Sequence, residues 1–420
     1  MTVTIQSNQL AELKSRYQGF LKQNLKLDMT RGKPCPQQLS LSDDLLHNLN
    51  HKDVVIAPDY RNYSPPDLLT GLPQMKAVFA KVLNIKPEQI IIGGNSSLNL
   101  MYDTIIKALV HKLPNEQQSW SEQGKIKFLC PTPGYDRHFA ICESFGIDMI
   151  SVPLTGSGPN MDKVEALVKA DKNIKGMWCV PKYSNPTGES YSDEVIKRLA
   201  YMQTAASDFR IMWDNAYAVH HLNIDDPVEI LNILDVCEQA GNPNRAFMFA
   251  STSKVTYAGA GVAIVAANKA NIDWLIHHLK VQTIGHDKIN QLHHLKLLPD
   301  ETAFMVHMAK HAALLKPKFD IVNEVLTHEL GAAGKFATWD KPKGGYFISF
   351  NSKPGLAKKI VQMAQDAGVK LTSAGATYPY GKDPIDSNIR IAPSLPSVTE
   401  LKKATEVLAV VTKIASLEAL

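Results

Sequence analysis

The sequence predicts an α/β protein: a mainly parallel sheet with helices on both faces, followed by a smaller α+β unit. Between residues 126 and 267, six short apolar runs alternate with longer helix-like stretches. This repeat is typical of a parallel sheet that is buried on both faces. After about residue 300 the pattern changes to a long helix, two short strand-like runs and further helices. We therefore expect an N-terminal segment over 1–60 that joins the small domain, a large domain over 61–300 and a small domain over 301–420.

Each apolar run of the large domain is short enough to be one buried strand. The runs are IKFLCP (126–131), DMISVPL (148–154), GMWCVPK (176–182), FRIMWD (209–214), AFMFAS (246–251) and GVAIVAA (261–267). The sixth run follows the fifth after a short connection, so one antiparallel strand is expected. Helices are expected at about 68–83, 162–169 and 192–205.

The two ends of the chain have their own patterns. Apolar residues at helical spacing from Leu10 to Leu21 predict an N-terminal helix. Glycine and prolines then predict loops over 27–36 and 57–67. In the C-terminal part we expect a helix from residue 301 with a bend at Pro317, and a terminal helix. Between those two helices we expect three elements, namely strands over 346–350 and 388–392 and a helix over 356–367.

The composition excludes several classes of protein. The chain has 420 residues and a net charge of only +4, whereas proteins of nucleic acids or membrane surfaces need a concentrated positive field. It contains no run of 18 apolar residues, and its start lacks the pattern of a secretory signal. Five scattered cysteines form no C-x-x-C pair, and the histidines show no metal-binding spacing. We expect a cytoplasmic protein without a disulfide framework, a metal, a nucleic-acid partner or a membrane partner.

Four short motifs follow predicted strands or form one: Ser184–Gly188, Asp214–Tyr217, Ser251–Lys254 and Asn388–Ala392. Ligands of open α/β sheets bind beyond the carboxyl ends of strands, which favours a site at the first three. Each motif also has a plain structural interpretation. In order, these are a turn, a helix cap or solvated acid, a surface loop, and a structural ion pair.

Together and in this order, the motifs resemble the fold-type I, pyridoxal-phosphate-dependent aminotransferases of class I/II. The likeness extends over nearly the whole chain. In particular, the chain resembles the aspartate aminotransferase subgroup Ic, also called the MocR-like aminotransferase family. Four stretches are similar to that subgroup, namely TRGKP (30–34), DNAYAVHHL (214–222), STSKVTYAGAG (251–261) and TIGHDKINQ (283–291). The resemblance implies fold type I, with a mainly parallel, seven-stranded-type sheet, and pyridoxal 5′-phosphate as the cofactor.

The resemblance assigns the chemical roles. Lys254 is similar to the lysine that forms a Schiff base with the cofactor aldehyde and then moves a proton. Asp214 corresponds to the acid that keeps the pyridine nitrogen protonated. Tyr217 and Asn185 correspond to the residues that reach the cofactor's phenolic oxygen, and Tyr135 to the aromatic residue that stacks on its ring.

The resemblance also assigns residues to the cofactor phosphate. Ser96 and Ser97 stand where a helix is expected to begin, and helix N-termini favour anions. Ser251 and Ser253 would add hydroxyl groups. Tyr63 resembles a tyrosine that reaches the phosphate in the neighbouring subunit, which implies a homodimer with sites at its interface.

Three residues are assigned to the substrate. Arg390 resembles the arginine that binds the α-carboxylate, because a guanidinium can hold a carboxylate with two hydrogen bonds. Gly32 would let the backbone approach the same carboxylate. Arg31 is a candidate for a second carboxylate on the substrate, although a surface ion pair is an equally ordinary role for it.

Two departures from the family pattern stand out. Most class I aminotransferases have an arginine eight residues after the lysine, where this chain has Val262. Lys288 is a candidate to meet the phosphate charge instead, from the same subunit or from its partner. Gly71 lies further after Tyr63 than is usual, so the expected dimer contact differs locally.

The implied reaction is transfer of an amino group between an L-amino acid, aspartate by the subgroup resemblance, and a 2-oxo acid, 2-oxoglutarate by the family, in a ping-pong mechanism. A β-lyase, or an aminotransferase for aromatic or other amino acids, would use the same Lys254 and Asp214. Aminotransferase-like domains also act as non-catalytic sensors fused to DNA-binding modules. Only about 60 residues precede the expected sheet here, which disfavours that alternative.

Overall fold

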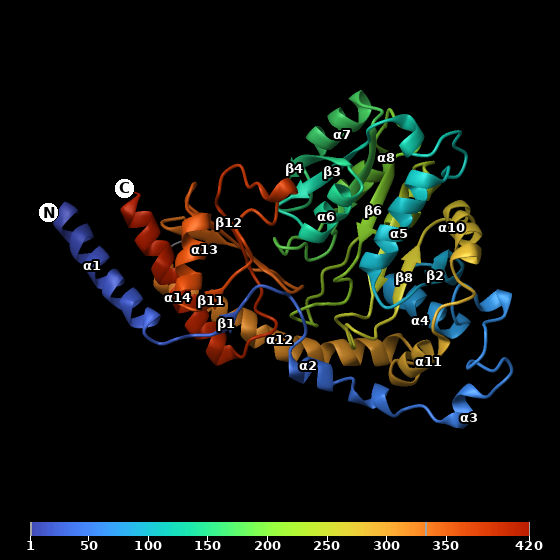
Figure 1. The fold of residues 1–420 in the computed structure, drawn as a ribbon, viewed down its shortest axis with the longest axis horizontal. Coiled ribbons are helices and arrows are strands. Elements are labelled where there is room, and N and C mark those ends of the chain that lie inside the picture. The colour runs from blue at the N-terminus through green and yellow to red at the C-terminus, as the bar shows by residue number, and fades with distance from the viewer. Residues whose placement is uncertain (1, 332–333, 420) are drawn as a thin grey trace.

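The central sheet of the protein has seven strands in the order β2-β8-β7-β6-β5-β3-β4 (Figure 1). The structure is a computed structural model that describes residues 2–331 and 334–419. In chain order the strands are β2 (Ile90–Ile92), β3 (Lys127–Thr132), β4 (Asp148–Pro153), β5 (Ile174–Cys179), β6 (Arg210–Asp214), β7 (Ala246–Ser251) and β8 (Ala263–Ala266). Only β8 runs antiparallel to its neighbours, β7 and β2, and the pairs from β7 to β4 are parallel. The predicted mainly parallel sheet with one reversed strand is confirmed.

Helices cover both faces of this sheet, as the apolar runs predict. Successive side chains of a strand point to opposite faces. Ile211 and Trp213 of β6 pack with one group of helices, and Met212 between them packs with the other. The first group is α4 (Pro73–Leu83), α7 (Met161–Ala170), α8 (Asp193–Tyr201) and α9 (Ile233–Gln239); the second is α5 (Ser97–Val110), α6 (Asp136–Ser144) and α10 (Lys269–Gln282). Burying a large apolar side chain contributes roughly 1.5–3 kcal/mol, which explains why both faces are apolar.

A smaller unit follows, built on a three-stranded antiparallel sheet and a two-stranded parallel sheet. The antiparallel strands are β9 (Ala337–Trp339), β10 (Ile348–Ser352) and β12 (Asn388–Ile391); the parallel pair is β1 (Leu27–Asp28) and β11 (Val369–Lys370). Helices α13 (Ala357–Asp366) and α14 (Val398–Glu418) pack with these strands in one core. Side chains of α1 (Thr2–Leu21) join the same core, so part of the N-terminal segment packs with the C-terminal unit.

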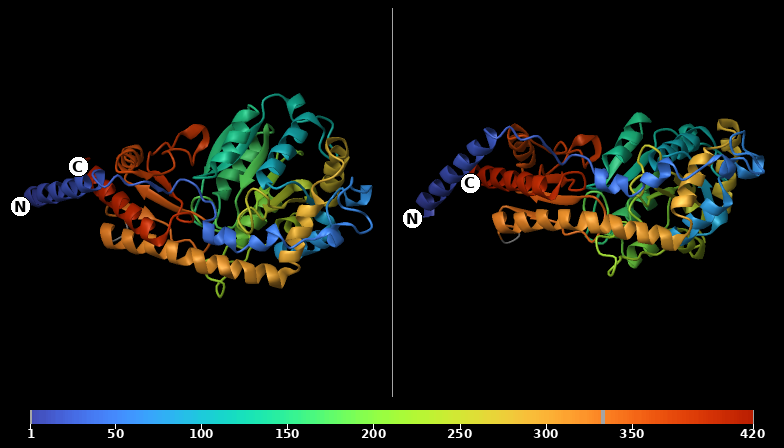
Figure 2. Two further views of the ribbon diagram at one scale, coloured as in Figure 1. Left: turned by 60° about the horizontal axis from the view of Figure 1, so that its bottom comes forward. Right: turned by 90° about the horizontal axis from the view of Figure 1, so that it is seen from below.

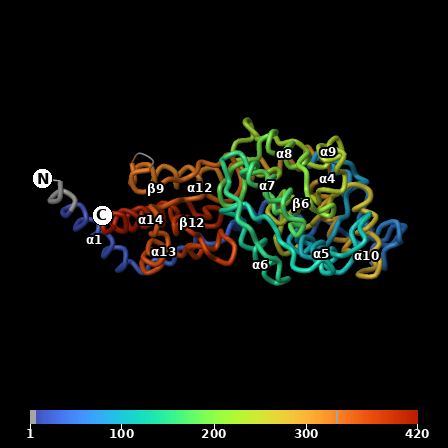
Figure 3. The backbone as a smooth tube through the Cα atoms, turned by 90° about the horizontal axis from the view of Figure 1, so that it is seen from above, coloured from blue at the N-terminus to red at the C-terminus, as the bar shows by residue number. Residues whose placement is uncertain are grey.

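One long helix, α12 (Glu301–Leu330), runs along both units and continues through Pro317 (Figure 2). Leu315 and Phe319 of α12 lie in the core of the small unit, whereas Phe304 and Met308 pack with Val78 and Val255 of the large unit. Both chain ends lie at the end of the molecule away from the large sheet (Figure 3). The division of the chain at residues 60 and 300 stays a prediction. Because α12 packs in the cores of both units, it belongs to neither unit alone.

The remaining short elements connect these parts. Between β1 and α4 lie α2 (Pro36–Ser40) and α3 (His51–Val54), and α11 (Lys288–Leu297) precedes α12. The 3₁₀ helices are η1 (Asp43–Leu46), η2 (Pro66–Leu68), η3 (Pro87–Gln89), η4 (Ser121–Gln123), η5 (Pro243–Arg245) and η6 (Pro379–Gly381). Within the described residues, no helix has both the length and the apolar character needed to cross a bilayer.

The sequence prediction differs from the structure at several elements: β1 lies in the expected loop over 27–36, β9 and β11 were not predicted, and two further differences are in the large unit. Strand β2 was not predicted, because three isoleucines after a proline turn form no alternating pattern. The helix expected from residue 68 begins only at Pro73. Gly71 lies between them with a φ of +105°, a left-handed conformation that breaks a helix and favours glycine. Proline at the first position of a helix is well tolerated, so α4 starts there.

Candidate active site

Three of the four sequence motifs meet at the carboxyl ends of neighbouring strands. Strands β5, β6 and β7 are adjacent and parallel, so the chain leaves each of them at the same edge of the sheet. The motifs that begin at Ser184, Asp214 and Ser251 follow these three strands in turn. The prediction of a site at this edge therefore has a structural basis.

Asp214, the last residue of β6, is a buried acid with one free oxygen. His138 of α6 donates from Nε2 to Asp214 Oδ2 over 2.9 Å, and the side chains are 2% and 4% exposed. The His138 ring lies flat on Trp178, with ring centres 4.2 Å apart. Asp214 Oδ1 has no hydrogen-bond partner among the described residues. A buried acceptor without a partner costs about 1–3 kcal/mol, so this oxygen is suited to accept a hydrogen bond from a bound molecule.

Lys254 lies one short loop beyond β7, close to the same acid. Its Nζ is 4.9 Å from the centre of the Tyr217 ring. Desolvation lowers the pKa of Lys254, and the negative charge of Asp214 acts in the opposite direction. A lowered pKa increases the fraction of neutral amine, which is the nucleophilic form.

Two tyrosines surround this pair. Tyr217 is 3% exposed, and Tyr135, which caps the start of α6, meets His138 edge-on at 4.9 Å between ring centres. Burial raises the pKa of Tyr135 to about 12 and raises the pKa of Tyr217 as well. Both phenols therefore stay protonated at neutral pH and can donate hydrogen bonds.

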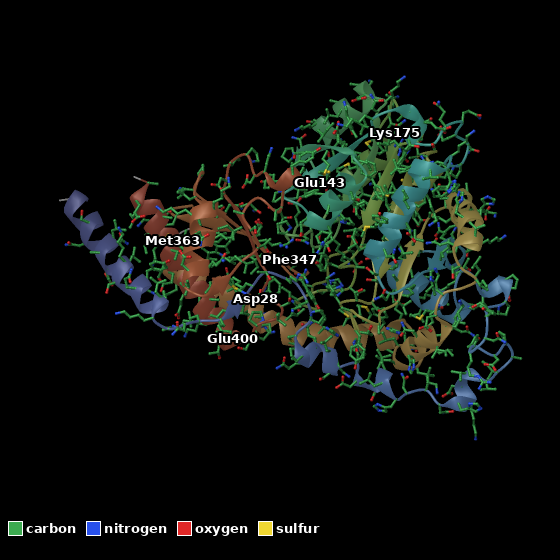
Figure 4. All side chains as sticks on the ribbon, viewed as in Figure 1. Asp28, Glu143, Lys175, Phe347, Met363 and Glu400 are labelled. Carbon is green, nitrogen blue, oxygen red and sulfur yellow. The ribbon has the colours of Figure 1, made fainter. Side chains whose placement is uncertain are left out.

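Arg390 comes from β12 of the small unit and faces the large unit. Its Nη1 donates to Asp136 Oδ1 over 2.9 Å and to Asn185 Oδ1 over 3.4 Å, and its Nη2 donates to Thr372 Oγ1 over 3.3 Å. The guanidinium lies 4.8 Å from the centre of the Phe347 ring. Figure 4 labels Phe347 near the junction of the two units. The fourth motif thus joins the other three through Asn185.

Four serines form a second group beside Lys254. Ser251 Oγ donates to Ser253 Oγ over 3.0 Å, and Ser253 Oγ donates to the carbonyl of Asn95 over 3.2 Å. Ser96 caps the start of α5 without a side-chain capping bond, and Ser97 is the first residue of that helix. The structure therefore brings Ser96 and Ser97 to the loop that holds Ser251 and Ser253.

Tyr63 and Lys288 lie in a different place. They line a cavity of about 620 Å³ formed by residues 60–64 and 283–289. Tyr63 is 77% exposed, whereas Lys288 is buried and donates from Nζ to the carbonyl of His286 over 2.8 Å. Neither has a hydrogen bond to the serine group or to Lys254 in the described part of the chain. Val262 is buried, and its N–H donates to Thr252 Oγ1 over 2.9 Å.

The two residues of the early loop have different settings. A Cβ on Gly32 would lie 2.4 Å from Phe347 Cζ, so only glycine fits against the ring that lies by Arg390. Arg31 is exposed, and its guanidinium has no hydrogen bond or ion pair to any described residue.

The sequence analysis missed several residues of this site. His138 and Asp136 both follow Tyr135 closely in PTPGYDRHF, so helical spacing was the available signal. No such signal pointed to Gln38 of α2, which donates from Nε2 to Tyr346 Oη over 2.9 Å. Tyr346 in turn donates to the carbonyl of Lys254 over 3.3 Å. Among the described residues there is no cluster of three or more His, Cys, Asp or Glu suited to a metal ion.

The fold and this site define a fold-type I aminotransferase, and comparisons with known proteins agree. The family model for aspartate amino-transferase matches residues 1–420. The chain belongs to this family, which confirms the resemblance and the fold class read from the sequence.

Individual relatives are similar over nearly their whole length. A protein of Mycolicibacterium smegmatis named as an aminotransferase is 48% identical over 97% of this chain and 96% of its own. An aspartate aminotransferase of Corynebacterium glutamicum is 44% identical over 97% of this chain and 93% of its own. The crystal structure of an aspartate transaminase of Corynebacterium glutamicum superimposes with a TM-score of 0.95 at 43% identity, covering 100% of this chain and 98% of that chain.

Proposed function

We propose that this aminotransferase binds pyridoxal 5′-phosphate and moves an amino group between L-aspartate and 2-oxoglutarate. The observation that supports the cofactor most directly is the pair formed by Lys254 and Asp214. An amine of lowered pKa and a buried carboxylate with one free oxygen belong to the same site. The name of the relative from Corynebacterium glutamicum supports aspartate as the donor.

The residues at the site fit this cofactor. When bound, pyridoxal 5′-phosphate supplies a reactive aldehyde and an electron-accepting ring. Asp214 Oδ1 would accept a hydrogen bond from the ring nitrogen, while His138 keeps the other oxygen in place. Tyr217 and Asn185 would donate to the phenolic oxygen. Tyr135, at the entrance to α6, would cover one face of the ring.

Lys254 has two tasks in this proposal. As a neutral amine it would hold the cofactor aldehyde, and its lowered pKa supports that state. The same amine would act as the base that takes a proton from the substrate Cα and gives it back. Tyr346 donates a hydrogen bond to the backbone carbonyl of Lys254, and this bond helps to fix the backbone position from which the lysine side chain extends.

The phosphate would lie at the start of α5. The N–H groups at a helix N-terminus favour an anion, and the hydroxyls of Ser96, Ser97, Ser251 and Ser253 would add donors there. Val262 stands where most class I aminotransferases have an arginine for the phosphate. We therefore propose that Tyr63 and Lys288 of the partner subunit of a homodimer contribute to the phosphate site instead. The exposure of Tyr63 in the single chain supports this part of the proposal.

Arg390 would bind the α-carboxylate of the substrate. Asp136 accepts a hydrogen bond from Nη1 of Arg390, so a bound substrate would displace or share this acid. Gly32 lies against Phe347 and places its backbone beside the same guanidinium. Arg31 is the candidate for the side-chain carboxylate of aspartate, because its guanidinium has no partner in the described chain.

An absorbance titration of the purified protein tests the cofactor and the donor together. A band near the visible region should disappear with aspartate and return with 2-oxoglutarate, and oxaloacetate should form. Turnover of aromatic or other donors without turnover of aspartate would instead favour a different aminotransferase. Release of ammonia and pyruvate-type products would indicate a β-lyase. Absence of the band in the purified protein and after addition of pyridoxal 5′-phosphate would reject the cofactor.

A further inference from the structure

A cavity lined by two arginines lies at the opposite end of the sheet from Lys254. It has a volume of about 230 Å³ and is lined by residues 114–116, by Ser207, Phe209 and Arg210, and by residues 241–245. Arg210 begins β6 and pairs with Gly176 of β5. Figure 4 labels Lys175, the neighbour of Gly176, at this far end of the sheet and Phe347 at the junction of the units. The cavity is therefore separate from the candidate active site.

Arg210 is a buried cation with few partners. It is 2% exposed, its Nη1 donates to the carbonyl of Phe209 over 3.1 Å, and its Nε has no partner among the described residues. It forms no ion pair with any described acid. Burial lowers the pKa of Arg210 to about 10; the negative charges of Glu116 and Asp208 act against this, and the like charge of Arg245 adds to it. An arginine in this setting lacks a counterion.

Arg245 forms the other cationic wall. It is 8% exposed, and its Nη1 donates to the carbonyls of Ala200 and Met202 over 2.7 and 2.8 Å. These carbonyls belong to the end of α8 and hold the guanidinium in place. Among the described residues, no carboxylate forms an ion pair with Arg245, and none accepts a hydrogen bond from its Nη2 or Nε. These two groups remain available to a ligand in the cavity.

The nearby acids are engaged elsewhere. Asp208 accepts from Lys175 Nζ over 2.6 Å and from Gln123 Nε2 over 2.7 Å. Glu116 lines the cavity and accepts from Ser207 Oγ over 2.9 Å. It attracts Arg210 electrostatically, but from beyond ion-pair distance. Three cations, Lys175, Arg210 and Arg245, therefore stand against two acids, which leaves one positive charge without a counterion in a buried setting. Such a charge is costly unless a counterion binds.

We propose that this cavity binds a small multivalent oxyanion, inorganic phosphate or a compact phosphate monoester, with Arg210 and Arg245 as its ligands. Guanidinium groups match such oxygens well, because each can donate two parallel hydrogen bonds. The cavity is several times larger than the roughly 30 Å³ that one water occupies, so it has room for such an ion. The bound anion would tie Arg210, the first residue of β6, to Arg245, which precedes β7 and is held by the end of α8. Its effect is on stability rather than on turnover.

Calorimetric titration of the holoenzyme with potassium phosphate tests the proposal, with potassium chloride at equal ionic strength as the reference. The cofactor occupies its own phosphate site in the holoenzyme, and its absorbance band reports that it stays bound. One phosphate should bind per chain. Saturating phosphate should raise Tm by about 2 °C or more, since ligands stabilise the folded state they bind. The KM for the amino donor should not change, because the substrate site lies elsewhere.

Ser207→Glu is the main variant, because Ser207 is exposed at the cavity mouth and its replacement leaves the core intact. It should weaken phosphate binding at least tenfold. Ser15→Glu, an exposed site on α1, adds the same charge far away and should bind phosphate like the parent. Arg245→Lys should weaken binding as well, and calorimetry reads this directly even if Tm falls.

Glycerol 2-phosphate distinguishes the two sources of the phosphate group. Binding of inorganic phosphate alone assigns the cavity to the free ion. Binding of the ester as well, or of the ester alone, assigns it to phosphorylated metabolites. No binding of either anion overturns the proposal. Equal phosphate affinity in the parent, Ser207→Glu and Arg245→Lys also overturns it, because the ion would then bind elsewhere.

Discussion

The two halves of the candidate active site differ in the hydrogen bonding of their charged side chains. In the sheet half, Asp214 has one oxygen held by His138 and the other free. In the half from the small unit, Arg390 is already hydrogen bonded to Asp136, Asn185 and Thr372. A buried free oxygen suits a group that stays bound, whereas an arginine with exchangeable partners suits a ligand that comes and goes. The contrast supports a resident cofactor on the sheet and an exchanging substrate at the small unit.

Replacement of Lys254 should have the largest effect. Lys254→Ala removes the amine that we propose holds the cofactor and moves the Cα proton, so turnover should fall by about 10⁴-fold or more. The visible absorbance band should be lost as well, and a steady-state assay with a spectrum of the same sample measures both. Lys254→Arg, which keeps the positive charge, should be just as inactive. Activity within tenfold of the parent in either variant would contradict the role of this amine.

The free oxygen of Asp214 gives the next prediction. Asp214→Asn keeps the size of the side chain but removes the charge that would hold the ring nitrogen protonated. We expect kcat to fall roughly 10²–10³-fold, the scale seen when one preorganised electrostatic contact is lost. His138→Asn should cause a smaller loss, because His138 positions Asp214 without touching the ring. A larger loss in His138→Asn than in Asp214→Asn would reverse the assignment.

Arg390 tests the other half of the site. Arg390→Lys keeps the charge but loses the planar pair of donors, and charge-assisted hydrogen bonds contribute about 1.5–3 kcal/mol each. The KM for the amino donor should therefore rise by roughly 10–100-fold, with a smaller change in kcat. The absorbance band should stay, because the proposed cofactor site lies in the sheet half. Loss of the band in this variant would show that the two halves are not separate in function.

Replacement of Asp136 should change the KM in the opposite direction to replacement of Arg390. Asp136→Asn removes the carboxylate that contacts Arg390 and would compete with the substrate, so the KM should fall by about two- to fivefold, the range for a partly exposed ion pair. Asp136 also lies in the first turn of α6, where an acid stabilises the helix. Asp193→Asn, the matching first-turn position of α8, controls for that effect and should leave the KM unchanged. A raised KM in Asp136→Asn would mean that this acid orients Arg390 instead.

The smallest expected effect is on stability and depends on pH. It concerns Glu189, which lies where the large unit contacts the small unit. Glu189 follows Gly188, where a Cβ would lie 2.3 Å from Pro342 of the small unit. Burial raises the pKa of Glu189 from 4.5 to about 7, against the hydrogen bond from the Gly158 N–H, while Asp340 adds to the increase. An acid whose pKa is raised by folding contributes stability below its unfolded pKa and loses it as pH rises. The contribution of Glu189 to stability should therefore decline between about pH 4.5 and pH 7.

Glu189→Gln should reduce this decline, because the neutral amide has no proton to lose. Melting temperatures measured from pH 4.5 to pH 8 give the comparison. Glu143→Gln, an exposed position of α6, should follow the parent curve. An unchanged slope in Glu189→Gln would show that another group dominates the pH dependence in this range.

Much of the fold could be predicted because it follows from local patterns. Six of the seven central strands coincide with apolar runs, since a strand covered on both faces must be apolar at every position. Strand β2 escaped notice because three residues are too few to show a period. The start of α4 was placed five residues too early, because the left-handed conformation of Gly71 is not visible in the sequence.

The candidate site divides in the same way. Lys254, Asp214, Asn185 and Arg390 were identified from motifs, and their positions in the structure allow the roles proposed for them. His138, Asp136 and Gln38 were not, because their partners are between 76 and 308 residues away in the chain. The assignment of Lys288 and Tyr63 to the phosphate remains a proposal, since in one chain they lie along a separate cavity.

By itself, the sequence determined the class of the protein, six of the seven central strands in their order along the chain, and the side chains available for chemistry. Those depend on residue types and short spacings, which local sterics and burial fix. Only the tertiary structure decided which charges are satisfied and which are free. Asp214 keeps one open oxygen, Arg390 has a competing acid, and Arg210 and Arg245 share a cavity without a counterion. Such differences depend on contacts between segments far apart in the chain, and no local pattern specifies the distances between them.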